Sequence, residues 1–126
     1  MPVETNEGRP LSNSDVRRIY LERVARIPEL NEQWLAEGLT ARERAERAWR
    51  IRHEARVDTR RLMSNPEEVE LLRARDQAKY GNPDGPTFEW LVENLEREGL
   101  TGDAAYEAIV EGSFRTNEAV NRLLKG

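Results

Sequence analysis

The feature that most constrains the fold is a short segment past the middle of the chain, Gly81-Asn82-Pro83-Asp84-Gly85-Pro86. It holds two prolines and two glycines within six residues. A helix is excluded there, because proline fixes φ and lacks an N–H, whereas glycine admits positive φ. Helical spacing is found on both sides of the segment. The sequence therefore predicts a rigid turn between two helices.

Apolar residues recur at three- and four-residue steps along most of the chain, and no window alternates apolar with polar residues. The pattern predicts an all-α fold, an irregular bundle of about six helices with no sheet, over residues 14–126. The first two helices either form one helix kinked at Pro28 or follow one another there. Side chains suited to cap helix N-termini lie at Ser14, Thr40, Asn65, Thr87, Thr101 and Thr116. Residues 1–13 are polar and aperiodic, which predicts a disordered leader or linker.

Two short segments repeat the same turn chemistry, Gly38-Leu39-Thr40 and Gly99-Leu100-Thr101. In each, the glycine suits the left-handed position after a helix, and the leucine suits the apolar contact that follows it. The threonine is placed to cap the next helix, and Glu43 completes a capping box with Thr40. Both segments are predicted to fold one helix back on its neighbour.

Composition limits the classes of function. The chain has no cysteine, which excludes a disulfide, a thiol nucleophile and a thiolate-bound zinc, and this fits a cytoplasmic setting. No run of apolar residues approaches the length needed to span a bilayer, and no signal peptide is recognisable at the start. The net charge of −4 argues against non-specific affinity for nucleic acid.

Positive charge is concentrated in residues 40–63, which hold eight arginines against four acidic residues. Two explanations remain open. The arginines pair inside the protein, including helical pairs such as Glu43–Arg47 and Glu46–Arg50, or they present cations to a phosphate-bearing partner.

His53 is the only histidine, which excludes mechanisms that need two imidazoles. One interpretation makes it a partly buried side chain hydrogen-bonded to a carboxylate. The other makes it a general base or acid, with Arg52, Arg56 and Arg60 stabilising negative charge on a phosphate or an oxyanion. The tryptophans at positions 34, 49 and 90 have helical spacing and are predicted to be core rather than a platform for bases.

Polar side chains crowd the proline–glycine turn, as they do at sites built on loops. They are Asp76, Lys79, Tyr80, Asn82, Asp84 and Thr87. In the alternative interpretation this is an ordinary connection whose Asn and Asp satisfy their own backbone. Asp76 with Lys79 lacks the strands on which a metal-nuclease set is built, and no glycine-rich phosphate loop is present. No metal site and no cofactor are predicted.

Three blocks carry a resemblance to a known family. The first is Arg52-His53-Glu54-Ala55-Arg56, and the second runs from Arg75-Asp76 through Lys79-Tyr80 to Thr87-Phe88. The third comprises Ser113, Arg115-Thr116-Asn117 and Asn121. From about Leu21 onward, the chain resembles the C-terminal variable domains that follow Rhs/YD-repeat cores in bacterial polymorphic toxins.

The resemblance implies a small toxin domain that acts in the cytoplasm, is exported as part of a larger protein, and is neutralised by a cognate immunity protein. We expect catalysis from His53, Arg56, Asp76 and Lys79 in metal-independent cleavage of RNA, DNA or a nucleotide. Substrate contacts are expected from Arg52, Tyr80, Asn82, Asp84, Thr87, Arg115 and Asn117. The alternative is a non-enzymatic helical binding module, such as an immunity or adaptor protein.

Overall fold

The computed structural model describes residues 13–112, and the regular structure in that range is helical, without a β-strand. The all-α prediction is confirmed. The helices are α1 (Asn13–Val24), α2 (Ile27–Ala36), α3 (Ala41–Leu62), α4 (Pro66–Tyr80) and α5 (Phe88–Arg97). Residues 103–112 are also helical. Among the described helices, none is long and apolar enough to cross a membrane.

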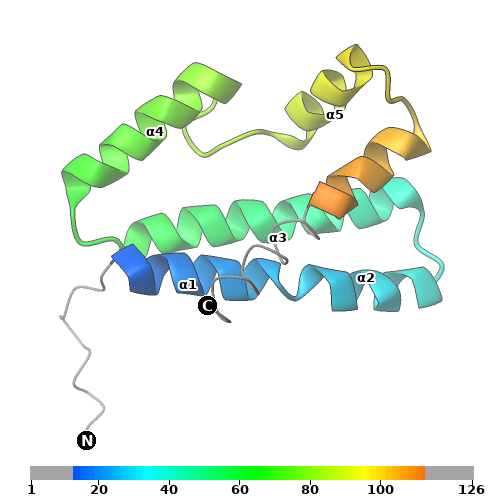
Figure 1. The fold of residues 1–126 in the computed structure, drawn as a ribbon, viewed down its shortest axis with the longest axis horizontal. Coiled ribbons are helices and arrows are strands. Elements are labelled where there is room, and N and C mark those ends of the chain that lie inside the picture. The colour runs from blue at the N-terminus through cyan, green and yellow to red at the C-terminus, as the bar shows by residue number, and fades with distance from the viewer. Residues whose placement is uncertain (1–12, 113–126) are drawn as a thin grey trace, which may run out of the picture.

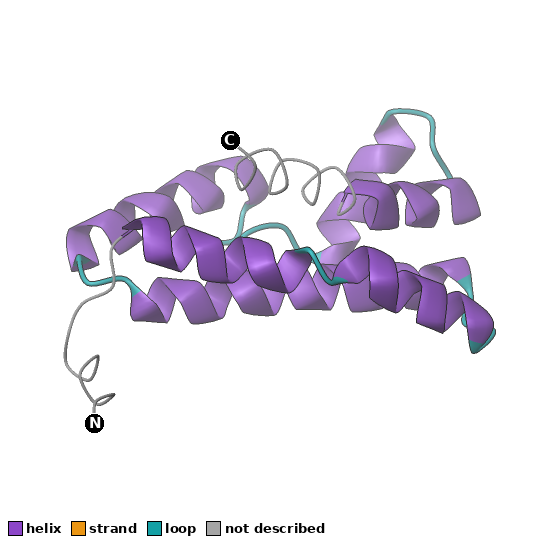
Figure 2. Cartoon of the chain, turned by 60° about the horizontal axis from the view of Figure 1, so that its bottom comes forward, coloured by secondary structure: helices purple, strands orange, loops and turns teal. Residues whose placement is uncertain are grey.

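The long helix α3 lies at the centre of the fold, with the other helices on either side of it (Figure 1). Helices α1 and α2 follow one another along one side of α3 and pack against it. On the other side lie α4, α5 and the helical residues 103–112, as Figures 1 and 2 show. The chain therefore forms a helical hairpin covered by a second set of shorter helices.

Helix starts and ends follow the predicted capping chemistry at most positions. Thr40 and Glu43 form the capping box, with Glu43 N–H donating to Thr40 Oγ1 at 3.1 Å and Thr40 N–H donating to Glu43 Oε1 at 2.9 Å. The hydrogen bond from the Thr40 backbone is the main reason why the pKa of Glu43 is lowered. Asn65 and Thr87 cap α4 and α5 as predicted.

The glycines of the two repeated turns adopt the predicted left-handed conformation. Gly38 and Gly99 have φ of 83° and 96°, in the left-handed region that glycine tolerates. After Gly38, the N–H of Leu39 donates to the carbonyl of Trp34 at 3.0 Å, and Leu100 makes the equivalent bond at 2.9 Å. These bonds close the ends of α2 and α5 and turn the chain sharply.

Other predicted boundaries were wrong by a residue or two. Helix α1 is described from Asn13 onward, so Ser14 lies inside it rather than at its N-cap. Of the two arrangements left open at Pro28, the structure shows two successive helices, with Pro28 in the first turn of α2. Thr101 lies two residues before the helical stretch 103–112, and the N–H of Ala105 donates to the carbonyl of Gly102 instead. The helix predicted after Thr116 lies outside the described residues.

The apolar core lies where α3 meets α1, α2, α5 and the helical residues 103–112. Its buried members are Val24, Ile27, Trp34, Ala45, Ala48, Phe88, Ile109 and Val110. Small alanines on α3 let the neighbouring helices approach closely. Helix α4 contributes none of these residues, and its one buried residue is Asp76. We infer that polar contacts hold α4 in place to an unusual degree.

A polar network also joins distant helices. The buried Arg44 donates to both carboxylate oxygens of Glu107, at 3.0 and 2.7 Å, and to Asn31 Oδ1 at 3.2 Å. The hydrogen bond to Glu107 raises the pKa of Arg44, and the same bond lowers the pKa of Glu107 below its ordinary 4.5. Internal pairing of the α3 arginines therefore occurs, here with a partner far away in the sequence.

This ion pair predicts a dependence of stability on pH. Because the folded pKa of Glu107 lies below its unfolded value, the stabilisation is complete above about pH 4.5 and is lost as pH falls through the folded pKa. The Glu107 side chain is 47% exposed, so we expect a loss of about 1 kcal/mol or less. The loss is measured as the difference in the free energy of urea unfolding between neutral and acidic pH, in the parent protein and in Glu107→Gln. An equal acid loss in both proteins would contradict the prediction.

Candidate functional site

The turn between α4 and α5 is stabilised by its own residues. The Asn82 side-chain oxygen accepts from the N–H of Asp84 at 2.8 Å, and the Asn82 carbonyl accepts from the N–H of Gly85 at 3.2 Å. Gly81 ends α4 with φ of 72°, and Gly85 has φ of 96°. The local interpretation therefore holds for Asn82, whose side chain satisfies the backbone of the turn. It does not hold for Asp84, whose carboxylate accepts from Arg73 instead.

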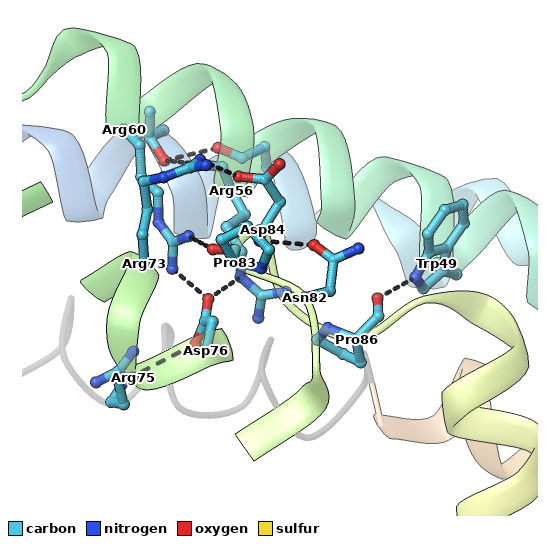
Figure 3. Close-up of polar contacts among 12 residues, drawn as sticks. Trp49, Arg56, Arg60, Arg73, Arg75, Asp76, Asn82, Pro83, Asp84 and Pro86 are labelled. Carbon is cyan, nitrogen blue, oxygen red and sulfur yellow. Dashed lines mark hydrogen bonds and ion pairs between the residues drawn. The ribbon is translucent and has the colours of Figure 1, made fainter. Parts of the chain in front are cut away.

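Asp76, on α4 just before the turn, attaches α4 to α3. Its carboxylate is almost fully buried and lies 2.5 Å from Arg60 Nη2, 3.9 Å from Arg56 Nε and 3.8 Å from Arg75 Nε (Figure 3). Only the Arg75 side chain is largely exposed, at 69%. A buried carboxylate needs such partners, since an unpaired buried charge is strongly unfavourable.

Further contacts clamp the turn against α3. Arg60 also donates from Nη1 to the carbonyl of Pro83 at 2.8 Å, so one guanidinium holds both α4 and the turn. Trp49, about three helical turns before Arg60 on α3, donates from its indole N–H to the carbonyl of Pro86 at 2.9 Å (Figure 3). On α4, Arg73 donates to Asp84 Oδ1 at 2.6 Å. The turn is thereby held at both ends.

A small cavity lies where the turn meets α3. Its volume is about 120 Å³, and its walls are Trp49, Arg52, His53, Arg56, Tyr80, Pro86, Leu91 and Ile109. The four residues from α3 follow the spacing of one helix face. Tyr80 comes from the end of α4 and packs edge-on against Trp90, with ring centroids 4.8 Å apart. The cavity therefore combines apolar walls with two guanidinium groups, an imidazole and a phenol.

The imidazole of His53 stacks on the indole of Trp49, with ring centroids 4.9 Å apart and planes at 17°. Its Nδ1 is buried and has no hydrogen-bond partner among the described residues. Among the described residues, no carboxylate is hydrogen-bonded to this nitrogen, so the first interpretation of His53 lacks its expected partner there. An unpartnered buried ring nitrogen in a cavity wall is unusual in a purely structural histidine.

The structure brings some of the predicted site residues together and separates others. Arg52, His53, Arg56 and Tyr80 line the cavity. Asp76 lies behind Arg56 in the ion-pair cluster. The remaining candidates lie elsewhere: Lys79 is exposed with its ammonium 5.3 Å from the Tyr80 ring, Asn82 and Asp84 belong to the turn, and Thr87 caps α5. Arg115 and Asn117 lie outside the described residues.

Sequence reasoning missed part of the cavity wall. Trp49 was assigned to the core, and it does pack against the core, but it also faces the cavity. Its position four residues before His53 was the available signal, because such residues lie on the same helix face. Pro86, Leu91 and Ile109 gave no comparable signal, since their approach to α3 depends on how the helices pack.

Comparisons of this chain with protein-family models, curated proteins and solved structures find no match. Within residues 13–112, no group of three His, Cys, Asp or Glu side chains is arranged to hold a metal ion. The chemistry of the site is therefore argued from the residues that line it. Those residues offer positive charge from Arg52 and Arg56 and a proton acceptor in His53.

Proposed function

We propose that this chain is a toxin domain that cleaves RNA without a metal ion, at the cavity lined by Arg52, His53 and Arg56. The observation that carries the proposal is that one imidazole and two guanidinium groups, from positions on a single helix face, line the same cavity. Guanidinium groups bind phosphate oxygens with paired N–H donors. An imidazole is the most frequent general base in enzymes.

The size of the cavity supports a phosphodiester group as the part of the substrate that enters. Its volume of about 120 Å³ is close to that of an engineered cavity of ~150 Å³ that holds a benzene ring. A phosphodiester group fits such a space, whereas a complete nucleotide does not. The rest of the polymer then lies against the surface outside.

RNA carries its own nucleophile, the 2′-hydroxyl, next to each phosphate. In the proposed step, His53 accepts the proton of the 2′-hydroxyl, O2′ forms a bond to phosphorus, and the bond from phosphorus to O5′ breaks. The departing 5′-oxygen takes a proton from solvent, and the imidazolium returns its proton to solvent. Arg52 and Arg56 stabilise the charge that develops on the phosphate oxygens. The products are a 2′,3′-cyclic phosphate and a 5′-hydroxyl.

The experiment uses purified protein, single-stranded RNA and a DNA strand of the same sequence, with a chelator present. We expect RNA to be cleaved to fragments that end in a 2′,3′-cyclic phosphate, and DNA to remain intact because it lacks the 2′-hydroxyl. Cleavage of both strands, or of neither, would contradict the proposal. In cells, induced expression is expected to arrest growth, and co-expression of a cognate immunity protein to restore it.

Gly85 offers a separate test, because Arg56 passes directly beneath its backbone. A side chain at Gly85 would overlap Arg56 Nη1, whereas at Gly81, which also has positive φ, there is open space. We expect Gly85→Ala and Gly81→Ala each to lower stability by about 1–2 kcal/mol through backbone strain. Only Gly85→Ala displaces Arg56, and we expect it to reduce RNA cleavage by up to about 10²-fold. Equal cleavage by the two variants would contradict this role of Arg56.

A second candidate function is that of a non-enzymatic helical binding module, and one surface favours it. Leu71 on α4 is 71% exposed and lies beside Pro66 and Ala74, with Glu67 and Glu70 at the edge of this surface. The partner that fits is a helix with apolar anchors flanked by basic residues. Under this function, expression is harmless to cells, and Leu71→Asp abolishes partner binding while RNA stays intact.

A further inference from the structure

We propose that a second, cationic groove beside the cavity binds the single-stranded RNA that flanks the cleaved phosphate. The inference rests on the proposed function and deepens it, because it makes the substrate a polynucleotide rather than a free nucleotide. The groove lies between α1, α3 and α4 and has a volume of about 350 Å³. Arginines reach it from all three helices: Arg17 from α1, Arg56 and Arg60 from α3, and Arg75 from α4.

Arg56 connects the two sites, since its side chain lines both the cavity and the groove. A strand whose phosphate is held at Arg56 in the cavity has a second cationic surface on the other side of the same side chain. A free nucleotide would occupy only the first site. The continuity at Arg56 therefore favours a ligand that carries several phosphates along a chain.

Four arginines line the groove against one acidic side chain, Glu68, so the groove keeps a positive balance. Arg60 is already hydrogen-bonded to Asp76 and to the carbonyl of Pro83. Arg75, in contrast, is 69% exposed and lies 3.8 Å from a carboxylate that Arg60 already neutralises. Arg17 is exposed and forms no ion pair with a described residue. These two cations remain able to contact phosphates.

The groove also offers an aromatic surface, as proteins that bind single strands usually do. Tyr20 of α1 lines the groove next to Arg17 and is anchored by packing against the apolar core. An anchored ring beside cations allows a base to stack while the phosphates are held, and stacking tolerates any base. We therefore expect binding with little sequence preference and with a strong dependence on salt.

The test measures binding without cleavage, in a His53→Ala background. The probe is a fluorescein-labelled single-stranded RNA of about twelve nucleotides, within the usual site sizes, and a dinucleotide serves as competitor. Arg17→Ala is compared with Arg18→Ala, which removes the same charge from the adjacent exposed position of α1 outside the groove. Fluorescence anisotropy at several salt concentrations gives the affinity and its salt dependence.

We expect Arg17→Ala to weaken binding of the long RNA about three- to fivefold and to reduce the salt slope by about 0.7, the value for one phosphate contact on a single strand. Arg18→Ala should match the parent protein, and the dinucleotide should compete poorly. Equal effects of the two substitutions on RNA affinity would contradict the proposal that the groove binds RNA. If the parent domain cleaves RNA yet Arg17→Ala binds normally, only this inference fails; if Arg17 matters but no RNA is cleaved, only the proposed function fails.

Discussion

Replacing His53 with alanine is expected to lower the rate of RNA cleavage by about 10²–10⁴-fold, the usual contribution of a positioned general base. The 2′-hydroxyl would then lose its proton acceptor, while Arg52 and Arg56 would still bind the phosphate. We therefore expect kcat to fall much more than affinity for RNA. Initial rates with saturating and limiting RNA separate the two quantities.

Two controls make the His53 result specific. Arg50→Ala removes an exposed charge from α3 at a position that does not line the cavity, and it should leave the rate unchanged. Free imidazole added to His53→Ala should restore part of the activity, since the stack on Trp49 leaves a space of the right shape. A rate within twofold of the parent protein would exclude His53 as the base.

Asp76→Ala is expected to destabilise the fold by about 3–5 kcal/mol, as observed when one partner is removed from a buried ion pair. Asp76 and Arg60 are the most enclosed ion pair of the described residues, with side chains 5% and 10% exposed. Without Asp76, Arg60 becomes an unpaired buried charge, and α4 loses its one buried residue. The free energy of unfolding in urea measures the effect.

Asp58→Ala is the matched control, because Asp58 forms an ion pair of 2.8 Å with Arg23 in which both side chains are 44% exposed. We expect it to change stability by about 1 kcal/mol or less. If Asp76→Ala were no more harmful than Asp58→Ala, α4 would not be held by its buried carboxylate. The ion-pair cluster behind Arg56 would then lose its role in positioning that side chain.

The parts of the fold that were predictable from sequence depend on neighbours within a few residues. Thr40, Asn65 and Thr87 cap helices because each side chain reaches N–H groups two or three positions ahead. Gly38 and Gly99 end helices because a left-handed residue is needed there. The same locality explains the errors at Ser14 and Thr101, because a cap-forming side chain does not by itself fix a helix start to within one or two residues.

The candidate site was predictable only in part. The helical period places Arg52, His53 and Arg56 on one face of α3, and the structure keeps them in one cavity. The period does not tell which other elements close that face. Tyr80 reaches the cavity, whereas Asn82 is used by the turn, although both were predicted to bind substrate.

The helices, most of their caps and the rigid turn follow from local sequence, because they depend on backbone preferences and hydrogen bonds that span a few residues. The pairing of charges follows only from how the helices pack: Arg44 pairs with Glu107, 63 positions away, and Arg60 with Asp76, 16 positions away. In a chain with 20 basic and 24 acidic residues, many pairings have similar chemistry. Packing of the helices selects among them, because an ion pair becomes strong only where both groups are brought together and shielded from water.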